Sequence, residues 1–78
     1  MVWRIYIWTD ENIQHLAEHD VTQDDFEAVL DAPVWEGVSG SSGLPACIGI
    51  VDGRRLFCVY EIIDEVYIHP ITAYEIGG

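Results

Sequence analysis

The fold is decided by residues 46–63, which read ACIGIVDGRRLFCVYEII. Two runs rich in β-branched and aromatic residues, 46–51 and 56–63, lie on either side of Asp52-Gly53. Asp-Gly is a strong signal for a two-residue hairpin turn, because the central positions of such a turn need a positive φ. The stretch therefore predicts two antiparallel strands joined by a tight turn.

Both cysteines of the chain lie within this hairpin. A two-residue turn pairs Val51 with Arg54, and counting back from that pair sets Cys47 directly opposite Cys58. The pair falls at a hydrogen-bonded position of the ladder, where the Cα separation is longer and disulfide geometry is poorer. We expect two reduced thiols that pack as small hydrophobic side chains.

A strand and a short helix are expected at the start of the chain. Residues 2–8 alternate and are rich in β-branched and aromatic side chains, which predicts a strand. Thr9 or Asp10 can then cap a helix, because a short oxygen-bearing side chain accepts hydrogen bonds from the first amides. The apolar positions within residues 11–18 form one stripe, which is typical of a short amphipathic helix.

A second helix and two more strands complete the expected set. The helix begins at Thr22 and ends at Pro33, since proline disfavours its continuation. Residues 34–38 and 66–74 read as strands on either side of the hairpin. The expected fold is a single α+β domain over residues 1–78, in the order β-α-α-β-β-β-β. Its two short helices pack on one face of an antiparallel sheet.

The register of the last strand depends on the turn at Asp64-Glu65. Taken as a two-residue turn, it places Tyr60 opposite His69, on the same face as Tyr67. Pro70 lacks an amide donor, so a bulge or an unpaired stretch is expected there. Two short helices can cover one face. The other face either forms a partner surface that includes Tyr60, Tyr67 and His69, or closes around the chain's own helices.

Charge is the most informative feature of the composition. Fourteen acidic residues face three basic ones in a chain of 78, which gives a net charge of −11. Nucleic-acid affinity comes largely from cations that replace counterions on phosphates, so unaided RNA binding is only weakly supported. The acidic surface is expected either to keep the chain soluble or to attract a basic protein partner.

The N-terminal residues and the apolar runs bear on location. No apolar run is long enough to span a membrane, because Asp64 and Glu65 interrupt the longest one. The first eight residues lack the three regions of a signal peptide. We therefore expect a cytoplasmic protein.

Residues 8–22 read WTDENIQHLAEHDVT, and this run resembles the start of the BrnT-like toxins. The resemblance resumes at residues 53–56 (GRRL), 59–61 (VYE) and 71–73 (ITA), and so covers nearly the whole chain. It implies a RelE-like fold, a bacterial toxin–antitoxin setting, and cleavage of mRNA either free or on the ribosome. Family members are typically basic, whereas this chain is acidic and has no lysine, so the resemblance is to a divergent, acidic form.

The resemblance assigns the chemistry to His19, Arg55 and Tyr74, the last at a position where the toxins usually have arginine. Metal-independent RNA cleavage needs a base, a cation for the phosphate and an acid for the leaving oxygen. His19 is the candidate base, and Arg54 or Arg55 can hold the phosphate. Tyr74 or Tyr60 can supply the proton. Alternatively, the histidine orders the turn between the helices, the arginines lie on an exposed hairpin tip, and the tyrosines pack.

Residues 15–19 also spell H-x-x-E-H, a pattern that places two histidines on one helical face. A zinc site needs at least a third protein ligand, and His69, Glu11 and Asp20 are the nearest candidates by type. Enzymes with this pattern are far larger, and a five-residue pattern arises readily by chance. We predict neither a metal site nor a cofactor.

Two functions follow from the sequence. The first is a BrnT-like, toxin-type domain of a toxin–antitoxin or derived system, with mRNA endoribonuclease activity and an antitoxin protein as its partner. The second is a non-enzymatic acidic interaction module, which forms a homodimer or binds a basic protein partner.

Overall fold

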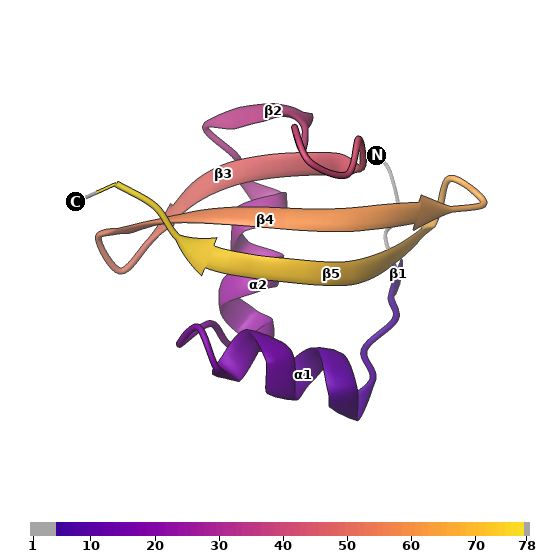
Figure 1. The fold of residues 1–78 in the computed structure, drawn as a ribbon, viewed down its shortest axis with the longest axis horizontal. Helices are drawn as coiled ribbons and strands as arrows, with labels where there is room; N and C mark the ends of the chain where they lie inside the picture. The colour runs from indigo at the N-terminus through magenta and orange to yellow at the C-terminus, as the bar shows by residue number, and fades with distance from the viewer. Residues whose placement is uncertain (1–4, 78) are drawn as a thin grey trace.

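The computed structural model describes residues 5–77 and has two helices and five strands (Figure 1). In chain order these elements are β1 (Ile5–Tyr6), α1 (Asp10–Ala17), α2 (Gln23–Asp31), β2 (Trp35–Val38), β3 (Pro45–Val51), β4 (Arg54–Ile63) and β5 (Tyr67–Glu75). The α+β class and the order β-α-α-β-β-β-β are confirmed. The first four residues of the chain, which include part of the first expected strand, lie outside the described residues.

The five strands form one sheet in the order β1-β5-β4-β3-β2. β2, β3, β4 and β5 are antiparallel neighbours, whereas β1 runs parallel to β5. The sheet is therefore mixed rather than wholly antiparallel, because the chain returns from β1 through both helices and three strands before β5 pairs with it. The described residues of β1 pair with Tyr67 and Ile68. Farther along β5, α1 packs against the strand.

The central hairpin has the predicted register. Val51 pairs with Arg54, and Cys47 lies directly opposite Cys58. Both cysteines are buried free thiols, as expected. Burial is the main reason why the pKa of the Cys58 thiol is raised well above its usual range, since a low-dielectric surrounding disfavours the thiolate.

The predicted register of β5 is wrong near the second turn. Ile63 pairs with Tyr67, so the turn holds three residues instead of two. Two of these, Asp64 and Glu65, have positive φ. As a result His69 lies opposite Glu61 and not opposite Tyr60, which pairs with Pro70. A bulge follows between residues 70 and 72, and it confirms the irregularity expected at the proline.

Both helices begin at the threonines that the sequence favours. The Thr9 side chain accepts a hydrogen bond from the amide of Asn12, and Thr22 forms a reciprocal capping box with Asp25. Between the helices, Asp20 adopts the left-handed region (φ 59°), which reverses the chain within a few residues. The two helices are thus separate elements with fixed starts.

The hydrophobic core lies between the helices and one face of the sheet. α2 passes behind the sheet in Figure 1, and α1 lies alongside β5. Phe26, at the centre, is fully buried; its ring meets the edge of Trp8, whose indole Nε1 donates a hydrogen bond to Glu27. The other buried members of this cluster are Leu16, Val21, Val29, Leu30, Cys47, Leu56, Cys58, Tyr60, Ile68 and Ala73. No helix among residues 5–77 is long and apolar enough to cross a membrane.

Candidate functional site

A row of rings crosses the face of the sheet that the helices leave uncovered. It runs from Trp35 on β2 to Phe57 on β4 and Tyr74 on β5. It continues to His19, in the turn after α1, and to His15 on α1. Neighbouring ring centroids along the row lie 6.3, 5.5, 6.3 and 5.4 Å apart. The register explains the first part, since Trp35 pairs with Ile48, Ile48 with Phe57, and Phe57 with Tyr74. Residues that lie directly opposite one another point to the same face.

The rings are accessible over part of this face. Trp35 is 44% exposed, Tyr74 is 39% exposed, and the neighbouring Ile50 is 59% exposed. By contrast Ala46 and Val59, which alternate onto the same face, are buried. The uncovered area is therefore the part around Phe57, Ile50 and Tyr74.

The Trp35 indole lies flat on the sheet. A Cβ built on Gly37 would lie 2.5 Å from the indole Cζ2 atom, so the ring rests directly on this glycine. The same indole stacks on Phe57 with an interplanar angle of 27°. One broad side of the ring is thus supported by the protein, and the position of the ring is fixed before any ligand arrives.

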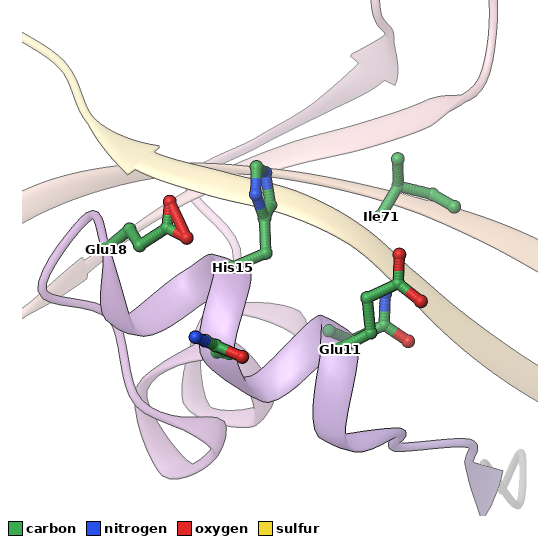
Figure 2. A pocket seen from close by; sticks show the side chains of 6 residues that line it. Glu11, His15, Glu18 and Ile71 are labelled. Carbon is green, nitrogen blue, oxygen red and sulfur yellow. The ribbon is translucent and has the colours of Figure 1, made fainter.

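The histidines reach the row because α1 lies beside the free side of β5. His15 Nε2 lies 3.0 Å from Thr72 Oγ1, within hydrogen-bonding distance. Figure 2 shows the His15 ring pointing from α1 toward β5, with Glu11 and Glu18 on either side of it and Ile71 across from the helix. These residues line an open hollow of about 500 Å³, which is polar on the helix side.

The two adjacent arginines have different surroundings. Arg54 faces the helices: its Nη1 donates to the Asp20 carbonyl at 2.9 Å, and its Nη2 donates to Asp25 Oδ2 at 3.1 Å. Arg55 points to the opposite face, because successive side chains of a strand alternate. Arg55 is exposed, and within residues 5–77 it forms no ion pair. It lines a hollow of about 200 Å³ with Gly53, Glu75 and neighbouring residues.

Two of the three residues that the resemblance assigns to catalysis, His19 and Tyr74, come together from distant parts of the sequence, and Arg55 lies on the same face of the sheet as Tyr74. The ring centroids of His19 and Tyr74 lie 6.3 Å apart. Arg55 lies two residues before Phe57, the cross-strand partner of Tyr74, and its backbone carbonyl accepts a hydrogen bond from Ile76. All three side chains are exposed. Arg54, the other candidate for holding phosphate, is engaged by Asp20 and Asp25.

The residues predicted to form a partner surface do not share one face. Tyr60 belongs to the buried core and is 8% exposed. Tyr67 and His69 lie on the opposite face of the sheet, near the second turn, where His69 Nδ1 is 3.7 Å from a Glu61 carboxylate oxygen. The cause is the register shift described above, which moves His69 from Tyr60 to Glu61.

Sequence reasoning missed Trp35 and Thr72 as members of this site. The signal for Trp35 was its place in a short strand beside the hairpin, but its partner strand has to be paired before the alternation of β2 can be assigned to a face. Thr72 could not be placed, because the bulge reverses the alternation of β5 ahead of it.

The histidine pair of the H-x-x-E-H pattern does not meet a third suitable side chain. The two rings are 5.4 Å apart and nearly perpendicular. Within the described part of the chain, no three His, Cys, Asp or Glu side chains are grouped so that they could hold a metal ion.

Comparison with known protein families, with curated proteins and with solved structures found no match for this chain.

Proposed function

We propose that this chain is a divergent, BrnT-like, toxin-type domain of a bacterial toxin–antitoxin or derived system, with mRNA endoribonuclease activity in the cytoplasm. The observation that carries the proposal is the approach of His19 to Tyr74, with Arg55 exposed on the same face of the sheet as Tyr74. These positions are up to 55 residues apart in the sequence, and the resemblance had named all three.

The proposed reaction is transfer of the phosphate from the 5′ oxygen of the next nucleotide to the ribose 2′ oxygen. His19 takes the proton from the 2′-hydroxyl, whose oxygen then attacks phosphorus. Arg55 binds the phosphate oxygens, which gain negative charge as the new bond forms. The bond to the 5′ oxygen breaks, and Tyr74 protonates that oxygen. The products are a 2′,3′-cyclic phosphate and a free 5′-hydroxyl, and neither a metal nor a cofactor takes part.

The net charge makes an unusual prediction for this activity. A chain of charge −11 repels RNA at long range, and of its arginines Arg54 is engaged by Asp20 and Asp25. Added salt screens that repulsion, so cleavage by the free chain should rise as ionic strength increases from about 0.01 to 0.15 M. Cationic nucleases that grip RNA through phosphate contacts behave in the opposite way.

The test measures RNA cleavage by the purified chain, with and without ribosomes, together with bacterial growth on expression. We expect cleavage and growth arrest for the wild type, and at least a ~100-fold loss of cleavage for His19→Ala, in line with the contribution of a general base. His69→Ala is the matched control, because this histidine also lies near the sheet surface but far along β5 from Tyr74. A folded wild type that neither cleaves RNA nor slows growth would contradict the proposal.

The second candidate is a non-enzymatic acidic module that binds a basic protein or forms a homodimer. The uncovered ring row favours it, because a large exposed apolar area usually marks an interaction site. Harmless expression of the folded chain, together with recovery of a basic protein partner or a dimer in solution, would support this candidate over the first.

A further inference from the structure

We propose that the ring row is a binding surface for an arginine-bearing, cationic segment of a partner protein, whose guanidinium groups stack on Trp35, Phe57 and Tyr74. This inference deepens the second candidate function, since it names the surface and the chemistry of the partner. It does not depend on RNA cleavage.

The geometry of the rings suits stacked guanidinium groups. Trp35 and Phe57 are nearly parallel, and Tyr74 follows at 5.5 Å from Phe57. Guanidinium groups stack on the faces of aromatic rings, with the strongest attraction at tryptophan. A segment laid across β2, β4 and β5 would thus meet successive rings on strands that are already paired with one another or with β3.

The ring surface is already formed before a ligand binds. The Trp35 indole is held by Gly37 beneath it and by Phe57 beside it. The backbones of Phe57 and Tyr74 are fixed by cross-strand pairing, and their rings contact each other with centroids 5.5 Å apart. Rings that are already ordered lose little conformational freedom when a ligand binds, so more of the contact energy appears as affinity.

The charge of the chain discriminates among the ligands that could bind an exposed aromatic face. A second copy would bring −11 against −11, and RNA would bring a polyanion toward the same field. A basic segment is attracted instead, and its association is accelerated at long range. The observations therefore favour a cationic protein over a second copy or RNA.

The experiment measures the affinity of the whole chain for synthetic peptides by calorimetry at about 0.1 M salt. The probes are an alternating arginine–glycine peptide of about ten residues and a lysine–glycine peptide of equal charge. A single-stranded RNA oligonucleotide and the sedimentation of the chain alone test the competing occupants. The variants are Trp35→Ala and Phe57→Leu, with Ile62→Ala as the control. Ile62 is an exposed apolar residue of β4 on the opposite side from Phe57, and circular dichroism checks that each variant is folded.

We expect the arginine peptide to bind at least about 3-fold more tightly than the lysine peptide, because only guanidinium combines charge with stacking. Trp35→Ala should weaken arginine-peptide binding about 5-fold or more, and Ile62→Ala should leave it unchanged. Equal affinity for both peptides, or binding that the two ring variants do not alter, would overturn this inference, although an acidic module that binds basic proteins elsewhere would stand. Absence of peptide binding would overturn both. RNA binding or self-association that depends on Trp35 would overturn the choice of partner.

Discussion

The two faces of the sheet both carry hydrophobic side chains, but those on one face are buried and many of those on the other are exposed. On the face toward the helices, Leu56, Cys58 and Ala73 are fully buried beneath α1 and α2. On the other face, Trp35, Ile50 and Tyr74 remain substantially exposed although they are of similar or larger size. Hydrophobicity along the strands is therefore no guide to the core by itself. Substitutions on the helix side should change stability, and substitutions on the ring side should change binding.

The largest expected effect is the loss of the Phe26 ring. Phe26→Ala should lower the free energy of unfolding by about 3–5 kcal/mol, because the ring is fully buried and its removal leaves a cavity beside Trp8. Urea denaturation measures the change. Ile50→Ala, on the ring side, is the control and should stay within about 0.5 kcal/mol. Equal losses for the two variants would show that the open face is covered in solution.

The adjacent residues Arg54 and Arg55 allow the two faces of the sheet to be compared by single substitutions. Arg54→Ala should cost about 1–2 kcal/mol of unfolding free energy, since it removes partly buried charge-assisted hydrogen bonds to the connection between the helices and to the α2 cap. Arg55→Ala should cost less than about 0.5 kcal/mol, because this side chain is exposed. Thermal denaturation of the two variants side by side tests this, and a larger loss for Arg55 would reverse our assignment of the faces.

The buried thiol predicts a loss of stability in alkali. Burial raises the pKa of Cys58 in the folded chain, while the unfolded thiol titrates near about 8.5. Below that pH both states hold the proton, and the thiol does not affect stability. Above it only the unfolded state releases the proton, so the free energy of unfolding should fall by up to about 1.4 kcal/mol per pH unit. Urea titrations at pH 8 and 9.5 measure the fall, which should be smaller in Cys58→Ala. An equal fall in that variant would assign the effect to other groups.

The smallest expected effect on stability comes from a change at Gly37, the glycine on which the Trp35 indole rests. In Gly37→Ala the new methyl group would lie within 2.5 Å of the indole, so the ring must swing away from the sheet and from Phe57. Because the ring is a side chain near the surface, the free energy of unfolding should change by less than about 1 kcal/mol. The tryptophan emission spectrum should nevertheless shift toward longer wavelength. An unchanged spectrum would indicate that the indole does not rest on this glycine.

The sequence predicts local structure well where one or two residues favour a single backbone conformation. Asp52-Gly53 determined the turn and with it the opposition of Cys47 and Cys58. The threonines at positions 9 and 22 determined both helix starts, because each satisfies otherwise unpaired amides. In these places local chemistry and the final fold agree.

The parts that were mispredicted depend on several elements at once. The Asp64-Glu65 turn takes in Val66 as a third residue, and two positive φ angles at non-glycine positions have no clear sequence signal. That one extra residue moved Tyr67 and His69 to the face opposite Tyr60. The ring row was not predictable either, since it requires the pairing of β2 with β3 and the position of α1 beside β5.

The bulge at Ile71 changes which residues of β5 face the helices: even-numbered residues do so before it and odd-numbered residues after it. Ile68 and Ala73 are five residues apart, an odd spacing that regular pleating would send to opposite sides, yet both belong to the same core cluster. Removing Ile71 would give regular alternation from Ile68 to Tyr74, with Ala73 still toward the helices and Tyr74 still on the opposite face. Ile71 is the extra residue of the bulge, and the facing of the residues on either side does not depend on it. Deletion of this residue should therefore remove the bulge and leave the side chains of Ala73 and Tyr74 on their present faces.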